Sequence, residues 1–448
     1  MISVMSFKSI NPSNGEVIAS HSKDSEQTIK EKIHLSENAF IRWKNSPFQE
    51  RKELLKRCAA SLRTNKKDFA QVIHAEMGKV LPECEAEIDK CAWVCEYYAD
   101  NGEQFLRNEL LEVHDNHAEV NFTPLGAVLA IMPWNFPFWQ VFRFAAPSIM
   151  AGNVALLKHA PNVFGCAKAI EQVFEGAKAP TGIFQSLYIE IPEIESIIAH
   201  PAIKAVTLTG SERAGKSVAS LAGKYIKKSV LELGGSDPFI VLEDADINKA
   251  MEVAIISRMR NAGQSCIAAK RFIVQEGVFS HFVEKFKEAT LKLKKDIDYG
   301  PLARVDLAET LEHQTNLSIE LGATLVCGGQ RDEAYFEPTI ISNVKSGMPA
   351  YHEELFGPVA SVIKVENMEE AIRIANDTNF GLGASIWSDD VNKAREMALQ
   401  IEAGSVYINQ LVASDPRIPF GGIKNSGYGR ELSLWGIREF VNIKPIVG

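Results

Sequence analysis

Val128-Leu-Ala-Ile-Met132 is followed at once by Pro133-Trp-Asn-Phe-Pro137, so a short apolar run ends in a turn that two prolines restrict. Comparable apolar runs lie at 154–157, 187–189, 205–208 and 239–242. The amphipathic segments between them lie at 165–176, 193–200 and 212–223. Alternation of buried strands with helices predicts a parallel sheet covered on both faces, with a ligand site at the carboxyl ends of its strands.

The chain on either side of this region extends the same picture. Residues 26–112 carry Glu, Lys, Leu and Ala at helical spacing, as in Glu50-Arg-Lys-Glu-Leu-Leu-Lys-Arg-Cys-Ala-Ala-Ser-Leu62, and predict amphipathic helices. A second alternating series begins near 247 and continues to about 415, through Arg271-Phe-Ile-Val274, Thr339-Ile-Ile341 and Ser405-Val-Tyr-Ile408. Since no long linker separates the two series, two closely packed α/β units are expected.

Composition narrows the class of protein. The 448 residues are 46% hydrophobic and 23% charged with a net charge of −9, which provides no overall cationic field for nucleic acid or anionic lipid. The start, MISVMSFKSINPSNGE, lacks the features of a secretory or transit leader, and no apolar run is long enough for a membrane span. The 7 cysteines are scattered, so we expect a cytoplasmic protein without disulfides or a metal site.

Two segments contain side chains suited to nucleophilic and base catalysis. In Asn261-Ala-Gly-Gln-Ser-Cys-Ile-Ala-Ala-Lys-Arg271, Cys266 lies among small and polar residues, unlike most structural cysteines. On composition alone a packing role for this cysteine is as well supported as a catalytic one. In Leu231-Glu-Leu-Gly-Gly-Ser-Asp-Pro238, Glu232 lies between two leucines, where loss of water would raise its pKa towards that of a general base. A carboxylate that caps a turn explains the same pattern.

Two further segments suggest binding groups. The side-chain amide of Asn135, held between Pro133 and Pro137, would be a rigid donor to an oxyanion, although a simple turn would look the same. The usual G-x-G-x-x-G dinucleotide fingerprint is absent. Instead, Thr209-Gly-Ser-Glu-Arg-Ala-Gly215 follows a predicted strand and opens a helix, where its N–H groups would hold a phosphate or merely be capped by Ser211.

These four segments, together with three others, resemble the aldehyde dehydrogenase superfamily in identity and order. In chain order they are Pro133-Trp-Asn-Phe-Pro137, the strand end at Lys158, Gly210–Gly215, Leu231-Glu-Leu-Gly-Gly235, Gly263-Gln-Ser-Cys266, Glu353-Glu-Leu-Phe-Gly-Pro-Val359 and Pro419-Phe-Gly-Gly-Ile-Lys-Asn-Ser-Gly-Tyr-Gly-Arg-Glu431. The resemblance extends from about Asn11 to Ile443, and within the superfamily it is nearest to the bacterial succinate-semialdehyde dehydrogenases.

The resemblance implies an α/β fold with three parts. A Rossmann-like dinucleotide-binding domain is expected over 1–114 and 133–231, and an α/β catalytic domain over 232–428. A small β oligomerisation arm is expected over 115–132 and 429–448, and with it a homodimer or homotetramer. Neither nucleic acid nor a membrane is an expected partner.

The resemblance also implies a reaction. Cys266 would attack the aldehyde carbon, and the amide of Asn135 with the Cys266 N–H would hold the oxyanion of the thiohemiacetal. Transfer of hydride to NAD or NADP would leave a thioester, which water activated by Glu232 would hydrolyse. The presence of Glu232 argues against release of the acyl group to coenzyme A. Together the three side chains argue against a relative that has lost catalysis and serves a structural or binding role.

The expected cofactor residues are spread over both predicted domains. They are Trp134, Lys158, Pro161, Gly210, Ser211, Gly215, Leu233, Glu354 and Phe356. Lys158 would reach the adenosine ribose, Ser211 the pyrophosphate, and Glu354 the nicotinamide ribose. Many NAD-preferring members have an acid where this chain has Pro161, so the sequence favours NAD over NADP only slightly.

Two arginines suggest the substrate. Arg143 and Arg260 match arginines that bind the substrate carboxylate in succinate-semialdehyde dehydrogenases, and Ser414 is a third expected contact. The expected reaction is therefore oxidation of succinate semialdehyde to succinate. If the arginines form salt bridges between domains instead, the chain would be a general aldehyde dehydrogenase, or one for another ω-carboxy aldehyde.

Overall fold

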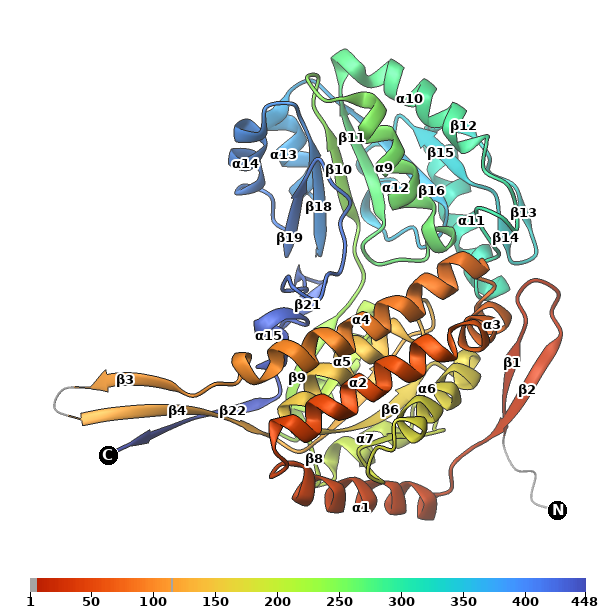
Figure 1. Ribbon diagram of the computed structural model, residues 1–448. Coiled ribbons are helices and arrows are strands. Elements are labelled where there is room, and N and C mark those ends of the chain that lie inside the picture. Colours follow the sequence, from red (N-terminus) through yellow and green to blue (C-terminus); the bar gives the residue numbers. More distant parts are fainter. Residues whose placement is uncertain (1–5, 114–115) are drawn as a thin grey trace.

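The computed structural model describes residues 6–113 and 116–448, which form two α/β lobes with a protruding β arm (Figure 1). Residues 1–5 and 114–115, which belong to the predicted domain ranges, lie outside the described residues. The first described elements are β1 (Ser6–Ile10) and β2 (Val17–Ser22), which form a hairpin beside the first lobe.

Four helices precede the first large sheet and confirm most of the helical prediction for 26–112. They are α1 (Glu26–Trp43), α2 (Phe48–Thr64), α3 (Lys66–Met77) and α4 (Leu81–Phe105). The hydroxyl of Ser25 caps α1 by accepting from the N–H of Thr28, and Pro82 occupies the first turn of α4, where no backbone donor is needed. The prediction was wrong at its end, because Glu109–Val113 forms strand β3.

The first lobe contains a six-stranded sheet in the order β21-β9-β8-β5-β6-β7. Its strands are β5 (Ala127–Met132), β6 (Val154–His159), β7 (Phe184–Ser186), β8 (Ile203–Thr209), β9 (Lys228–Glu232) and β21 (Gly427–Tyr428). All neighbouring pairs are parallel except β21 with β9. The connecting helical elements are α5 (Trp139–Ala151), η1 (Pro161–Val163), α6 (Phe164–Gly176), α7 (Glu193–Ala199) and α8 (Glu212–Lys224).

The strand predicted at 187–189 is wrong, because the strand in the sheet is the preceding segment, Phe184–Ser186. The N–H of Leu187 still donates to the carbonyl of Leu157 at 2.7 Å. The next residue, Tyr188, forms two hydrogen bonds with Asp24. The carbonyl of Tyr188 accepts from the N–H of Asp24, and the N–H of Tyr188 donates to the Asp24 carboxylate. The apolar run therefore leaves the sheet to join the segment before α1.

The second lobe contains a seven-stranded sheet in the order β12-β15-β16-β11-β10-β18-β19. Its strands are β10 (Asp237–Val241), β11 (Ala269–Gln275), β12 (Thr324–Cys327), β15 (Thr339–Ser342), β16 (Val359–Val365), β18 (Gly383–Trp387) and β19 (Ser405–Ile408). Only β12 runs antiparallel to its neighbour. The helical elements of this lobe are α9 (Ile247–Met259), η2 (Arg260–Gly263), α10 (Glu276–Thr290), α11 (Val305–Glu320), α12 (Pro349–His352), α13 (Met368–Asn376) and α14 (Val391–Ala398).

Short elements complete the structure. Two-residue strands pair as β13 (Arg331–Asp332) with β14 (Tyr335–Phe336) and as β17 (Phe380–Gly381) with β20 (Ile423–Lys424). The protruding arm is an antiparallel sheet of β3, β4 (Asn116–Pro124) and β22 (Val441–Val447), with β4 in the centre. The predicted arm was too long: Ala127–Met132 is a central strand of the first sheet, and Ser433–Ile437 forms helix α15 against α4 and α5.

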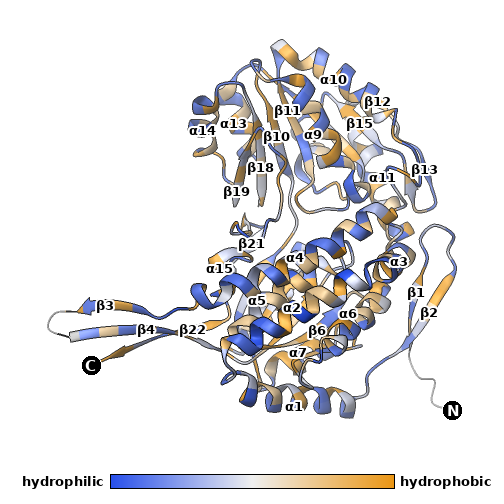
Figure 2. Ribbon diagram, viewed as in Figure 1, coloured by the Kyte–Doolittle hydropathy of each residue, from blue (hydrophilic) through white to orange (hydrophobic). Residues whose placement is uncertain are grey.

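Hydrophobic residues concentrate in the strands and in α5, while the outer helices alternate in hydropathy (Figure 2). Every residue of α5 from Trp139 to Ala151 is buried, because the helix lies between the sheet and α4. This burial fixes the side chains of the turn that precedes α5. No helix among residues 6–113 and 116–448 is long and apolar enough to cross a membrane.

Candidate active site

Cys266 lies in a tight loop between α9 and β11, residues 260–268, which is called the nucleophile loop after the role predicted for Cys266. Three consecutive residues before it have left-handed backbone: Asn261 at φ 54°, Ala262 at φ 50° and Gly263 at φ 73°. At Gly263 a side chain is excluded, because a Cβ atom would lie 2.3 Å from the carbonyl oxygen of Gly357. Such backbone is costly and persists only when surrounding contacts hold it. Here the guanidinium of Arg258 donates to the carbonyls of Gly263 and Ala269, at 2.6 and 3.1 Å.

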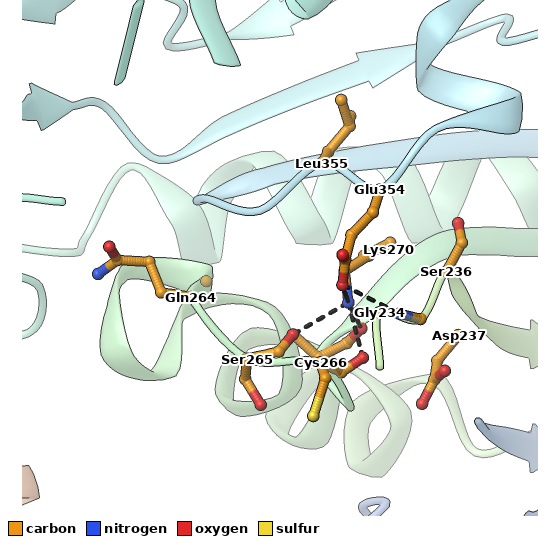
Figure 3. A network of polar contacts seen from close by, with 12 residues as sticks. Gly234, Ser236, Asp237, Gln264, Ser265, Cys266, Lys270, Glu354 and Leu355 are labelled. Atoms are coloured by element: carbon orange, nitrogen blue, oxygen red, sulfur yellow. Dashed lines mark hydrogen bonds and ion pairs between the residues drawn. The ribbon is translucent and has the colours of Figure 1, made fainter. Parts of the chain in front are cut away.

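A buried lysine ties this loop to the opposite side of the site (Figure 3). The ammonium group of Lys270 donates to the carbonyls of Ser265, Cys266 and Ala268, at 3.0, 2.8 and 3.2 Å. It also lies 3.5 Å from the carboxylate of Glu354, which accepts from the N–H of Gly235 at 3.0 Å. The Cys266 sulfur points away from this network in Figure 3, so the network holds the loop and leaves the thiol free.

The surroundings of Cys266 keep its thiol neutral in the free protein. Burial raises the pKa of the thiol to about 12, and the carboxylates of Glu354 and Glu232 act in the same direction. Arg143 and Lys270 oppose this shift by favouring the thiolate. If Cys266 attacks an aldehyde as predicted, its deprotonation would require a nearby base or a further positive charge.

Asn135 is buried against the nucleophile loop. Its side-chain nitrogen donates to the carbonyl of Gln264 at 3.1 Å, and its own carbonyl accepts from the Asn261 amide at 2.8 Å. The amide nitrogen carries two hydrogens, so one remains for an oxyanion formed beside Cys266. This arrangement holds the predicted oxyanion donor next to the predicted nucleophile.

Glu232 ends β9 and is fully enclosed. Neither of its carboxylate oxygens has a hydrogen-bond partner among the described residues. Burial and the nearby Glu431 raise the pKa of the Glu232 carboxyl to about 8, while Arg143 and Arg430 act in the opposite direction. A Cβ atom on Gly421, whose φ is +154°, would lie 2.7 Å from this carboxylate, so the glycine gives the side chain room. A carboxyl group with this pKa suits general base catalysis near neutral pH.

Arg143 is buried near both Glu232 and Cys266, and its guanidinium already has partners within the protein. Its guanidinium forms a buried ion pair with Glu431 and donates to the hydroxyl of Thr209 at 3.3 Å. Glu431 is itself buried, which raises its pKa. The sequence left open a salt bridge between domains for Arg143; the salt bridge present is with a residue that follows β21 of the first sheet.

A cavity of about 540 Å³ opens onto Cys266. Arg143, Arg260 and Ser414 line it, so all three predicted substrate contacts share one cavity with the predicted nucleophile. Arg260 is exposed, whereas Ser414 is buried. Glu232 does not line this cavity and lies instead beside Arg143 and Gly421.

The expected cofactor residues lie at the carboxyl ends of the first sheet's strands and on the facing loop of the second lobe. Trp134 and Phe356 meet edge to face with ring centres 5.7 Å apart. Ser211 caps α8, accepting from the N–H of Ala214, after Gly210 has left β8. Gly215 is buried against Leu233, whose side chain would lie 2.5 Å from a Cβ atom, so these two residues position α8 through packing.

Lys158, at the end of β6, provides the test of whether a dinucleotide fits here. Burial alone lowers the pKa of its ammonium group, and no carboxylate in the described part of the chain pairs with it. Pro161 begins η1 three residues later and brings no acid. A ribose or phosphate would supply the acceptors that Lys158 lacks, so the donor set fits a nucleotide.

Three charged residues of the site were not identified from the sequence: Lys90, Lys270 and Glu431. Lys90 lines the cavity from α4, Lys270 holds the nucleophile loop, and Glu431 pairs with Arg143. Lys270 and Glu431 lie inside motifs that the sequence analysis had already identified. Lys270 follows Cys266 by four residues, and Glu431 ends the segment that begins at Pro419, so these positions could have marked them as site residues. Lys90 has no such signal, because it looks like any surface lysine of an amphipathic helix.

Comparison with known proteins adds independent support. The model of the aldehyde dehydrogenase family matches residues 3–446. A probable succinate-semialdehyde dehydrogenase [NADP(+)] of Synechocystis sp. is 47% identical over 99% of both chains. A succinate semialdehyde dehydrogenase [NAD(P)+] of Escherichia coli is 44% identical over 98% of this chain and 97% of its own length.

Solved structures agree. The succinic semialdehyde dehydrogenase of Streptococcus pyogenes, in complex with NADP+, superposes with a TM-score of 0.96 at 37% identity and covers 98% of this chain and 99% of its own. The family model and the identities both extend over nearly the whole chain. The protein is thus a member of the aldehyde dehydrogenase family and an NAD(P)-dependent oxidoreductase.

Proposed function

We propose that the protein oxidises succinate semialdehyde to succinate. The observation that carries this proposal is the single cavity that has the Cys266 thiol together with the cationic Arg143 and Arg260 and the hydroxyl of Ser414. A substrate that fits this cavity would place its aldehyde carbon at the thiol and a carboxylate at the cationic groups. It is therefore a short molecule with an aldehyde at one end and a carboxylate at the other. The names of the relatives from Synechocystis and Escherichia coli support the same substrate.

The chain supplies groups for each step that a thiol-dependent aldehyde oxidation needs. Cys266 forms the covalent adduct, and the free hydrogen of the Asn135 amide stabilises its oxyanion. When bound, the oxidised nicotinamide serves as hydride acceptor. Glu232, with a pKa of about 8, then takes a proton from the water that hydrolyses the thioester.

The two arginines have different surroundings, and we propose different roles for them. Arg260 is exposed at the cavity and can turn its guanidinium to a substrate carboxylate. Arg143 is paired with Glu431 and lies close enough to Glu232 and Cys266 to oppose the rise in pKa that burial causes in both. Its main contribution is a fixed positive charge beside the reacting groups.

Replacing the two arginines separately tests this division. A charge-assisted hydrogen bond contributes roughly 1.5–3 kcal/mol, so Arg260→Ala should lower kcat/KM for succinate semialdehyde by about ten- to a hundredfold. Butanal, which has no carboxylate, should be oxidised at nearly the wild-type rate. Arg143→Ala should slow both aldehydes, because it leaves Glu431 buried and unpaired near Glu232. The measurement is the absorbance of the reduced nicotinamide over a range of each aldehyde.

The outcome for wild-type protein decides the substrate. Equal kcat/KM for butanal and succinate semialdehyde would make the chain a general aldehyde dehydrogenase. An equal loss for both aldehydes in Arg260→Ala would mean that this arginine is structural. Glutarate semialdehyde in the same assay measures the preferred distance between the aldehyde and the carboxylate.

We also propose that NADP is accepted at least as well as NAD. The names of the relatives do not support the slight preference for NAD that the sequence suggested. Lys158 carries no paired acid among the described residues, and Pro161 stands at the exposed start of η1. A 2′-phosphate would thus meet a cation and no carboxylate.

Pro161→Glu tests this interpretation. A carboxylate at this position should repel the 2′-phosphate and raise KM for NADP about tenfold, while KM for NAD changes little. Kinetic titration of each cofactor at saturating aldehyde gives both values, and Pro161→Gln serves as the uncharged control. A parallel rise for both cofactors in the two variants would instead mean that the proline shapes the loop.

The β arm offers a surface for association of two or more copies. Exposed apolar side chains occupy β3 and β22, among them Leu110, Ile443 and Val447. Both strands are edges of the three-stranded sheet, so their outer backbone groups are free to pair with another strand. We propose that these edges join copies of the chain into a homodimer or a homotetramer. Measurement of the molecular mass of the protein in solution would distinguish the two.

A further inference from the structure

Lys90 projects from α4 into the cavity that contains Cys266. Its amine donates to the hydroxyl of Ser414 at 2.8 Å and lies 4.1 Å from the centre of the Trp139 ring. In the described part of the chain, it forms no ion pair with a carboxylate. Lys90 is partly buried at the cavity wall, where a lysine without a counterion is unfavourable because water solvates its charge only in part.

Charged side chains of both signs line the cavity around Lys90, with the carboxylates of Glu83, Glu87 and Asp298 beside the two arginines. Arg143 approaches from α5 and Arg260 from η2, and both oppose its protonation. Glu87 and Cys91 of α4 act in the opposite direction, while Asp415, beside Ser414, pairs with Arg417. Burial, the largest effect, and the two arginines lower the pKa of the Lys90 ammonium to about 7. Glu87 pairs with Lys79, and Glu83 accepts from the N–H of Asn261, so in the described part of the chain neither carboxylate forms an ion pair with Lys90. A bound anion would supply the missing partner.

Ser414 supplies the second observation. Its hydroxyl oxygen accepts two hydrogen bonds, one from the amine of Lys90 at 2.8 Å and one from the indole N–H of Trp139 at 3.0 Å. A hydroxyl has two acceptor sites and one hydrogen, so both acceptor sites of Ser414 are used. While Lys90 donates to it, the hydroxyl hydrogen is left without an acceptor among the described residues and is free to donate to an incoming molecule. An acceptor without hydrogens of its own, such as a carboxylate, fits this hydroxyl.

We propose that Lys90 and Ser414 together bind the carboxylate of the aldehyde substrate, with Lys90 as a specificity-determining residue. This inference rests on the proposed oxidation of an ω-carboxy aldehyde. One carboxylate oxygen would accept from the Lys90 ammonium and the other from the Ser414 hydroxyl, while Arg260 closes the open side. Trp139 keeps both groups in place through its ring face and its N–H.

The charge state of Lys90 then couples substrate binding to pH. Below a pH of about 7 the ammonium is already present, so the anion binds without proton uptake. Above that pH each binding event must add a proton, and KM for the anionic aldehyde should rise. KM for butanal should not follow this rise, since butanal makes no demand on Lys90. Titration of Glu232 affects both aldehydes and cancels in their ratio.

Lys90→Met and Lys90→Arg test the proposal, with Lys56→Met as the matched control. Lys56 pairs with Asp100 on the surface of α2, away from the cavity, so its removal should leave kinetics unchanged. Lys90→Met should raise KM for succinate semialdehyde about ten- to a hundredfold with little change in kcat, and leave butanal unaffected. It should also remove the rise of KM with pH. Lys90→Arg should restore part of the affinity and none of the pH dependence, because an arginine stays charged.

Inhibition by succinate separates this inference from the proposed function, since it needs no turnover. Succinate should inhibit the wild-type protein at least about tenfold more strongly than Lys90→Met, with butanal as the oxidised substrate. Equal inhibition of the two proteins would overturn the role of Lys90. A wild-type preference for succinate semialdehyde that Lys90→Met retains would also overturn it. Failure of the wild type to prefer the anionic aldehyde would count against the proposed function, and the succinate inhibition would still decide whether Lys90 binds carboxylates.

Discussion

Cys266→Ala is expected to abolish aldehyde oxidation, with a loss of at least about a thousandfold in kcat, because no covalent adduct can form. The nucleophile loop should keep its shape, since Lys270 and Arg258 hold it through backbone carbonyls and not through the thiol. Binding of the reduced cofactor should therefore persist. Fluorescence of the bound reduced cofactor measures binding, and its absorbance measures turnover.

The matched control is Cys327→Ala, which removes a partly buried cysteine of β12 in the second lobe. It should retain activity. More than a few per cent of wild-type turnover in Cys266→Ala would place the nucleophile elsewhere. Loss of cofactor binding together with activity would indicate that the alanine disturbs the loop, and the kinetic result would then say nothing about covalent catalysis.

Much of the fold was predictable because its central strands are short and uniformly apolar. Strands β5, β6, β8 and β11 coincide with predicted runs, since strands buried on both faces carry no polar alternation. Leu187–Ile189 has the same composition, yet its backbone pairs with Asp24, a contact that local sequence does not encode. The same limit applies to β1 and β2, for which no strand was predicted.

The site shows a similar division. Cys266, Glu232 and Asn135 stand in motifs where small residues and prolines mark an unusual backbone, so each was a candidate from sequence alone. Lys90 and the partner of Arg143 depend on segments more than 280 positions apart, since Ser414 and Glu431 meet α4 and α5 only in the folded chain. A charged residue on an amphipathic helix gives no sign of whether it faces solvent or a cavity.

Glu232→Gln is expected to leave the first half of the reaction and stop the second. Acylation of Cys266 precedes the step that needs a base for water, so one equivalent of reduced cofactor per active site should appear rapidly. The steady-state rate that follows should fall by about a hundredfold or more, the usual contribution of a general base. Rapid mixing with absorbance detection resolves the burst, and Glu284→Gln on the exposed face of α10 serves as the control.

The pH dependence gives the same prediction an independent test. Because burial and Glu431 raise the pKa of Glu232 to about 8, the carboxyl group is mostly protonated at pH 7 in the free protein. A base works only when deprotonated, so a hydrolysis-limited kcat should rise with pH, reach half of its maximum at a pH of about 8 and level off roughly one unit above that. Glu232→Gln should lose this rise. Absence of any burst in this variant would mean instead that Glu232 also takes the proton from the Cys266 thiol.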